Sequence, residues 1–171
     1  MPLLENQVDT NSAFSDEELL YRRVSTSELT GGELDPSRLN SISFDKEIDG
    51  APSVLRGRFS SPLDAIHVDC AGGKDKSDCL VYFMAVGEIP GPLRSGDGRD
   101  LVFPIVHRPL PRCGAHSVIG CCEEGNPEKT YVVPSRKVRN DLRAKLATRL
   151  LPITQIFDIA TKKPITPSFT P

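Results

Sequence analysis

The alternation of apolar and polar residues along the chain predicts several short strands. We expect strands at residues 20–24, 41–44, 52–59, 79–89, 101–107, 115–122 and 130–134. The segment 79–89 is apolar on both faces, which is typical of a central strand. Pro104 removes a backbone donor from the segment 101–107, and this favours an edge position or a bulge. Because the connections are short and turn-like, antiparallel pairing is expected.

Two helices are predicted by capping residues and periodicity. After the N-cap Ser135, apolar residues recur at every fourth position: Val138, Leu142, Leu146 and Leu150. Pro152 ends this helix, which we place at residues 135–150. Ser61 followed by Pro62 predicts a second, short helix that runs to about residue 66. The expected fold class is α+β, a mostly antiparallel sheet of five or six strands with one long C-terminal helix packed on it.

Length and composition favour a single domain. The chain has 171 residues, 38% of them hydrophobic, with 15 Pro and 13 Gly, which suits one core and many turns. We expect a mobile arm at residues 1–14, a domain at 15–160 and a Pro-rich tail at 161–171. The first residues lack the pattern of a signal peptide, and no apolar run approaches the ~18 residues of a membrane span. A cytoplasmic protein without a membrane partner is therefore expected.

The segment 112–122, "RCGAHSVIGCC", holds three of the five cysteines. An odd count without a secretory pattern predicts reduced thiols. Two pairs, His67 with Cys70 and Cys113 with His116, have spacings that zinc sites use, and Cys113 with His116 also has the elements of a thiol nucleophile and its base. The more common interpretation is a hairpin that enters a strand, with Cys121 or Cys122 as a small core residue. We expect no bound metal.

The outer face of the predicted helix 135–150 is strongly basic. It carries six cations against one acid, Asp141, a net of +5, and its first members are Arg136, Lys137, Arg139 and Arg143. The chain as a whole has a net charge of −2 and a pI near 5.9, so no global attraction to polyanions is expected. The basic face suits a protein partner, nucleic-acid phosphates or plain solvation. We expect a protein partner, with nucleic acid as the alternative.

Two consecutive arginines, Arg22 and Arg23, interrupt an otherwise apolar strand. Since neighbouring residues on a strand face opposite sides, one of them must point toward the core or into a cleft. A half-buried guanidinium needs an acidic group or a ligand as partner. The only Gly-Gly-Lys segment, "CAGGKDKSD", lacks the spacing of a phosphate-binding loop, so we expect no cofactor.

Four segments, "LLYRRV", "SISF", "PSVLRGRF" and "PRCGAHSVIG", resemble in order and spacing a family of short uncharacterised bacterial proteins. The resemblance covers residues 17–122. This chain has Leu55 where the family has an acid, and "RCGAH" in place of an Asn-Pro turn. The family has no established activity. The resemblance implies a bacterial accessory or interaction protein that acts by binding, in a conflict or defence system.

The chain is also similar to ADP-ribosyltransferase-like folds, in which an Arg or His on the first strand and a Ser or Tyr before a short helix shape a nicotinamide pocket. The matching positions here are Arg22 or Arg23, Ser43 or Ser60, and Glu123 or Glu124. This similarity implies, as the alternative function, an enzyme or toxin that uses NAD. Its catalytic candidates are Arg22, Arg23, Ser43 and His116.

Overall fold

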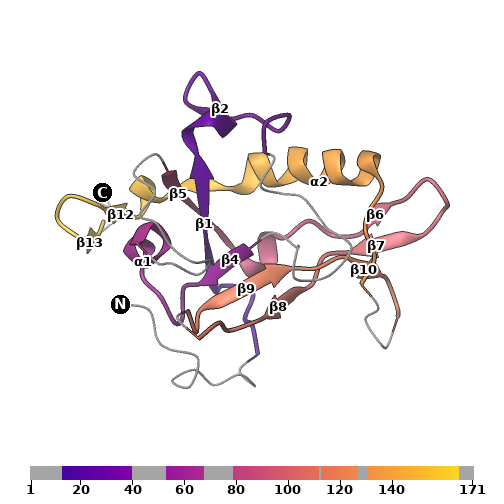
Figure 1. The fold of residues 1–171 in the computed structure, drawn as a ribbon, viewed down its shortest axis with the longest axis horizontal. Helices are drawn as coiled ribbons and strands as arrows, with labels where there is room; N and C mark the ends of the chain where they lie inside the picture. Colours follow the sequence, from indigo (N-terminus) through magenta and orange to yellow (C-terminus); the bar gives the residue numbers. More distant parts are fainter. Residues whose placement is uncertain (1–12, 40–52, 68–78, 112, 127–130, 166–171) are drawn as a thin grey trace, which may run out of the picture.

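The computed structural model describes residues 13–39, 53–67, 79–111, 113–126 and 131–165. Its main feature is a six-stranded sheet in which neighbouring strands pair antiparallel (Figure 1). From one edge to the other the strands are β11 (Leu151–Pro152), β5 (Cys79–Ala85), β1 (Leu19–Ser25), β4 (Ser53–Arg56), β9 (His116–Ile119) and β8 (Ile105–His107). The predicted fold class is confirmed.

Smaller sheets and short helical turns extend this core. A three-stranded sheet contains β10 (Cys122–Glu123), β7 (Asp100–Val102) and β6 (Leu93–Arg94). Two hairpins are formed by β2 (Leu29–Thr30) with β3 (Glu33–Leu34), and by β12 (Phe157–Asp158) with β13 (Lys163–Pro164). Single 3₁₀ turns follow three strands: η2 (Thr26–Glu28), η4 (Val86–Glu88) and η5 (Ile153–Gln155).

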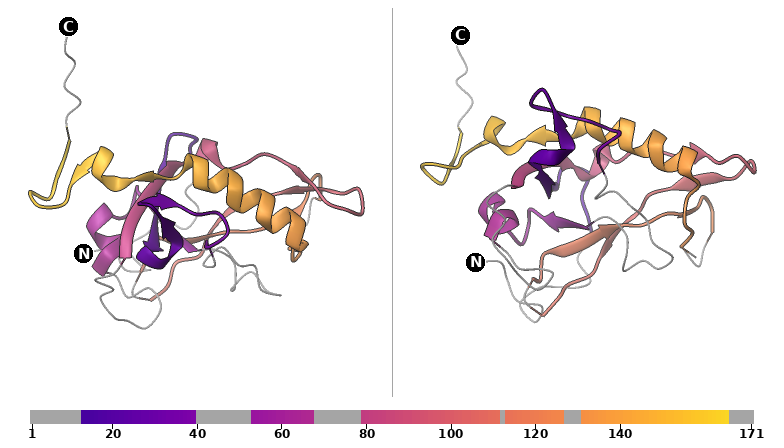
Figure 2. Two further views of the ribbon diagram at one scale, coloured as in Figure 1. Left: turned by 90° about the horizontal axis from the view of Figure 1, so that it is seen from above. Right: turned by 45° about the horizontal axis from the view of Figure 1, so that its top comes forward.

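Each helix packs against the sheet in one of two hydrophobic clusters. Helix α2 (Arg136–Arg149) buries Val138, Leu142 and Leu146, as the sequence pattern predicts. These residues pack in one cluster with apolar residues of the sheet, among them Leu20, Val24 and Met84. Helix α1 (Pro62–His67) contributes Ala65 to the other cluster, together with Tyr21 and Leu55. The right view of Figure 2 shows α2 running along the top of the molecule, with α1 well apart from it. Alternate side chains of β1 thus pack into two different hydrophobic clusters.

Three of the predicted strands are divided or shortened. The segment 101–107 separates at Pro104 into β7 and β8, and β8 lies at the sheet edge as Pro104 predicts. The segment 115–122 breaks at Gly120, where a Cβ atom would lie 2.6 Å from the Tyr131 ring. The segment 79–89 ends as a strand at Ala85, because the Glu88 carboxylate accepts the Ala85 N–H at 3.0 Å and starts η4. Residues 41–44 lie outside the described residues.

Of two further predictions, one strand is wrong and one helix is confirmed. Residues 130–134 were expected as a strand, but their described part forms only a single bridge, from Tyr131 to Cys122. The short helix after Ser61 is confirmed. The Asp64 carboxylate accepts the Ser61 N–H at 2.7 Å, which closes the first turn as the sequence indicates.

Candidate functional site

Arg22 is the arginine of β1 that faces the core. Its side chain is buried, whereas Arg23 on the opposite side of the strand is half-buried. Nη1 of Arg22 donates to the Ser53 carbonyl at 2.8 Å. Burial lowers the pKa of Arg22 to about 10, and the nearby Glu28 carboxylate acts in the opposite direction. The expectation that one arginine of the pair enters the core is therefore confirmed, and its position on β1 fixes the start of β4.

His116 is held between a backbone carbonyl and a serine hydroxyl. Its Nδ1 lies 2.7 Å from the Arg108 carbonyl oxygen, and its Nε2 lies 3.2 Å from Oγ of Ser53. Burial lowers the pKa of His116, with the Arg108 carbonyl acting to raise it and the Arg108 charge to lower it. A neutral imidazole at neutral pH follows. Since a carbonyl only accepts, Nδ1 carries the hydrogen and Nε2 accepts from the Ser53 hydroxyl.

Ser53 therefore joins two of the residues that the sequence singled out. Arg22 binds its carbonyl and His116 binds its hydroxyl, and Ser53 itself is exposed. Arg23 is not part of this cluster, and Ser43 lies outside the described residues. We call the three residues Arg22, Ser53 and His116 the Ser53 site.

Sequence reasoning missed Ser53 because no local motif marks it. The register of the sheet places it there, since β4 pairs with β1 through Tyr21 and Leu55 and with β9 through Leu55 and His116. Ser53 is two residues before Leu55 on the same side of the strand, which brings its hydroxyl toward the imidazole. The one available signal was its place as the first residue of a predicted strand.

A second serine and histidine pair lies beside this site but is closed to solvent. Nδ1 of His107 is 3.1 Å from Oγ of Ser117, which is fully buried. Burial lowers the pKa of His107, as does the Arg56 charge, whereas Glu18 acts to raise it. The His107 ring is tilted against Phe59 at 5.7 Å between centroids. This pair belongs to the packing of the sheet edge.

Arg56 forms a buried ion pair that sequence reasoning also missed. Nε and Nη2 donate to the two oxygens of Glu18 at 2.7 and 2.6 Å, and Nη2 also donates to the Ala13 carbonyl at 3.2 Å. The guanidinium lies 3.8 Å from the centre of the Phe14 ring and 4.9 Å from that of Phe59. All of these contacts are within the chain, so Arg56 joins the N-terminal segment to the sheet.

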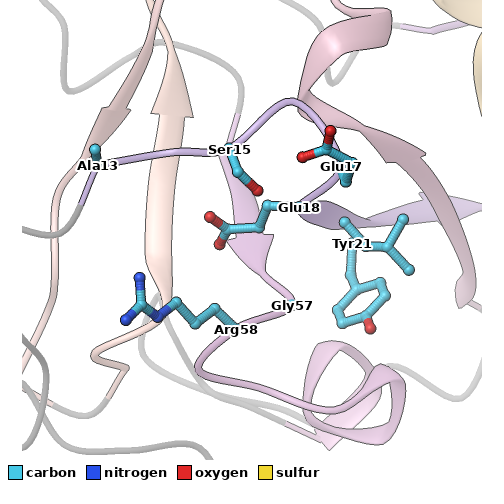
Figure 3. A pocket seen from close by; sticks show the side chains of 8 residues that line it. Ala13, Ser15, Glu17, Glu18, Tyr21, Gly57 and Arg58 are labelled. Carbon is cyan, nitrogen blue, oxygen red and sulfur yellow. The ribbon is translucent and has the colours of Figure 1, made fainter.

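An open pocket of about 380 Å³ borders this ion pair (Figure 3). It is lined by Ser15, Glu17, Glu18, Tyr21 and Arg58, with Ala13, Leu19 and Gly57. The Glu18 carboxylate is already used by Arg56, and burial raises the pKa of the Tyr21 hydroxyl. The pocket is therefore a surface hollow above a structural contact, and its lining includes none of the residues of the Ser53 site.

The cysteines behave differently from the expectation of reduced thiols. Cys113 is fully buried and disulfide-bonded, while Cys79, Cys121 and Cys122 are free. The expectation is therefore wrong for Cys113, and so is the thiol nucleophile that it offered, because its sulfur is already bonded. Spacing alone does not reveal such a pairing, since it depends on the tertiary structure. The other cysteine of the sequence, Cys70, lies outside the described residues.

Cys121 and Cys122 are both core residues. Cys121 is 1% exposed and Cys122 is 3% exposed, whereas the sequence predicts one of them as a core residue. Burial raises the pKa of the Cys121 thiol to about 12, so it remains protonated and unreactive at neutral pH. The break at Gly120 explains the difference, because the two cysteines do not belong to one regular strand.

On the outer side of α2, Arg136, Lys137 and Lys145 are exposed, and Arg139, Arg143 and Arg149 are half-buried. Lys137 pairs with Asp141 at 2.7 Å, Arg143 donates to the Asn140 side chain at 3.5 Å, and Arg149 donates to the Glu88 carbonyl at 2.6 Å. No described residue forms an ion pair or side-chain hydrogen bond with the other three cations, Arg136, Arg139 and Lys145. We call the outward cations of α2 the cationic face.

No protein-family model, curated protein or solved structure matches this chain. Within the part of the chain that the structure describes, no three His, Cys, Asp or Glu side chains gather as a metal site requires. No helix in the same part is long and apolar enough to cross a bilayer. Any functional conclusion must therefore come from the geometry of this chain.

Proposed function

We propose that this protein acts by binding a partner protein that has an acidic surface, through the cationic face of α2. Three of the face's cations, Arg136, Arg139 and Lys145, have no ion-pair partner among the described residues. The helix is fixed from below by Val138, Leu142 and Leu146, which are at most 1% exposed. A rigid element thus presents charge outward, which lowers the conformational cost of binding.

The position of the charges along the helix is the observation that carries the proposal. Arg136 and Lys137 occupy the first turn of α2, which contains no acidic residue. The positive end of the helix dipole lies there, so each exposed cation costs about 0.3–1 kcal/mol of stability. The stability of the free protein does not explain this arrangement. A partner that supplies negative charge to the same turn does.

Apolar residues at both ends of the face favour a protein over nucleic acid. Val133, just before the helix, is 46% exposed, and Leu151, just after it, is 38% exposed. Arginine combined with exposed apolar groups is typical of protein interfaces. Helix α2 has no aromatic residue that stacks on a base.

The resemblance to short bacterial proteins supports placing this binding role in a cytoplasmic conflict or defence system. The alternative, an enzyme that uses NAD, stays a prediction. It requires Arg22 or Arg23, a serine hydroxyl and a carboxylate around one pocket, but Arg22 is buried and its Nη1 binds the Ser53 carbonyl. The binding function has the more direct support from the geometry.

Photo-cross-linking in the source cells tests the proposal. A photoreactive residue replaces Ala144, which is exposed between two members of the cationic face, and the control carries it at Thr161, an exposed residue of the turn between β12 and β13. We expect an adduct to one acidic protein at position 144 that is absent at position 161. The adduct must also disappear in the variant Arg136→Glu, Arg139→Glu. Adducts to nucleic acid alone, or the same adducts at both positions, would overturn the proposal.

A further inference from the structure

We propose that Ser53 is a nucleophile activated by His116, and that it accepts acyl groups from small activated esters. The proposal is independent of the binding function and rests on one row of hydrogen bonds. Oγ of Ser53 lies 3.2 Å from Nε2 of His116, and Nδ1 of the same ring lies 2.7 Å from the Arg108 carbonyl oxygen. A nucleophile, a base and a group that orients the base are the three parts that serine catalysis requires.

The direction of the hydrogen bonds is the one that proton transfer needs. The Arg108 carbonyl accepts from Nδ1 and so selects the tautomer with the lone pair on Nε2. That lone pair faces the Ser53 hydroxyl and takes its proton when Oγ attacks an electrophile. The separation of 3.2 Å is at the long end of hydrogen-bond reach, as is common before a substrate is bound.

Ser53 is both fixed and accessible. Arg22 holds its carbonyl at 2.8 Å, and β4 is hydrogen-bonded to a strand on each side. The residue itself is exposed, so an electrophile reaches Oγ without a change of fold. His116 is half-buried, which keeps the imidazole neutral beside an exposed hydroxyl. These features separate Ser53 from an ordinary surface serine, whose hydroxyl has no fixed base.

A comparison with the pair formed by His107 and Ser117 shows which features are particular to the Ser53 site. Its hydrogen bond is of similar length, 3.1 Å, but Ser117 is fully buried, and no hydrogen-bond partner of Nε2 of His107 lies among the described residues. The ring is therefore not oriented through its second nitrogen, and the hydroxyl is closed to reagents. Of the two described pairs, only Ser53 combines an oriented base with an accessible hydroxyl.

The chemical step balances without a cofactor. Oγ of Ser53 bonds to the ester carbonyl carbon as its proton passes to Nε2 of His116. The bond between that carbon and the leaving oxygen then breaks, and the leaving alcohol takes the proton back from Nε2. The products are acyl-Ser53 and the free alcohol. Water attacks the acyl-serine by the same route, which releases the acid and restores the hydroxyl.

Reaction of the full-length protein with 4-nitrophenyl acetate and with a fluorophosphonate probe tests the proposal. Peptide mass spectrometry should place one acetyl or phosphonyl group on Ser53. The variant Ser53→Ala should lose this label. In His116→Gln the label should form about 10²-fold more slowly, which is the usual contribution of a general base. The control Ser37→Ala, which removes an exposed hydroxyl that donates to Asp35 rather than to a histidine, should label as the wild type does.

Peptide mapping of the wild-type protein keeps the test decisive if a variant fails to fold. Label spread over lysines, or found on His116 with Ser53 unmodified, would overturn the proposal. Equal labelling rates in wild type and in folded His116→Gln would also do so, because the imidazole would then have no role. Loss of the Ser53 label leaves the cross-link at position 144 unaffected, so failure of this proposal is distinguishable from failure of the binding function.

Discussion

A fully buried arginine is stable in this chain because every face of it is occupied. Arg56 is 0% exposed, and both oxygens of Glu18 bind it. The rings of Phe14 and Phe59 lie over the guanidinium. The Arg56–Glu18 pair stabilises the fold only when both members are present, because removing one member leaves the other charge buried without its counter-charge.

The substitution Glu18→Gln tests whether the ion pair with Arg56 stabilises the fold. The substitution keeps the shape of the side chain but removes the charge that faces Arg56, so we expect a loss of about 3–5 kcal/mol in the free energy of unfolding. Urea denaturation measures it. The matched control is Glu17→Gln, because Glu17 is exposed, and we expect its effect to stay within about 0.5 kcal/mol. Similar losses in the two variants would show that the Arg56 pair is not structural.

His107 and His116 predict a stability that depends on pH. Burial lowers the pKa of His107 and His116 below the ordinary value of 6.5. The unfolded chain therefore binds their protons more readily, and the stability they provide is complete above about pH 6.5 and lost as pH falls through the lower folded values. The charges that act on them are Arg56, Glu18 and His116 at His107, and Arg108 at His116.

Urea midpoints from about pH 8 to about pH 5 check this prediction. The wild type should lose stability on acidification across that range, and the double variant His107→Gln, His116→Gln should lose less of it. The carboxylates with lowered pKa values, such as Asp35 and Asp158, titrate mainly below this window. A wild-type protein that gains stability on acidification, or a double variant with the same slope, would contradict the account.

At the scale of elements, local signals were sufficient for α2. The Ser135 hydroxyl caps the Val138 N–H at 3.4 Å, and the helix runs Arg136–Arg149, within one residue of the prediction at each end. Capping and fourfold spacing are local properties, so the sequence carries them directly. The strand divisions at Pro104 and Gly120 depend on contacts with other segments, such as the Tyr131 ring beside Gly120.

The candidate sites also differ in whether local sequence or contacts between distant segments determine them. The cationic face was predictable, because it follows from the residues of one helix. The burial of one of Arg22 and Arg23 was predictable, because neighbouring residues on a strand face opposite sides. Ser53 was not predictable, because the register between β4 and β9 places it. The disulfide of Cys113 also depends on residues that are distant in sequence.

Charge reversal at the two ends of α2 should have opposite effects on stability. Arg136→Glu puts an acid in the first turn, where the helix dipole favours it, and should stabilise the free protein by about 0.3–1 kcal/mol. Arg149→Glu puts an acid in the last turn and removes the hydrogen bond to the Glu88 carbonyl, and should destabilise it. Urea midpoints measure both. Destabilisation by Arg136→Glu would show that this cation has a structural role.

At the scale of the whole molecule, of the four cysteines that the structure describes, one is disulfide-bonded and three have free thiols. Cys79, Cys121 and Cys122 are free, and Cys113 is bonded. Among the described cysteines of denatured, unreduced protein, a thiol reagent should therefore modify Cys79, Cys121 and Cys122 but not Cys113, as mapped by mass spectrometry. Prior reduction should expose Cys113 and lower stability by about 2–4 kcal/mol. Alkylation of Cys113 without reduction would contradict the disulfide.

The two proposed activities use different parts of the molecule. Partner binding rests on the outward side of α2, whose inner side packs on the sheet, while the Ser53 site lies where β4 meets β9 and β1. The sheet fixes both, since its strands supply the core under α2 and the register that joins Ser53 to His116. Changes in one site should therefore leave the other intact.

The central claim is that the cationic face exists for a partner and not for the stability of the fold. Its most direct test compares, for the wild type and for the variant Arg136→Glu, Arg139→Glu, the yield of the protein cross-link from position 144. This yield should fall at least about tenfold, a change of about 1.4 kcal/mol in binding, while the urea midpoint stays equal or rises. A yield that persists, or that falls only together with the midpoint, would contradict it.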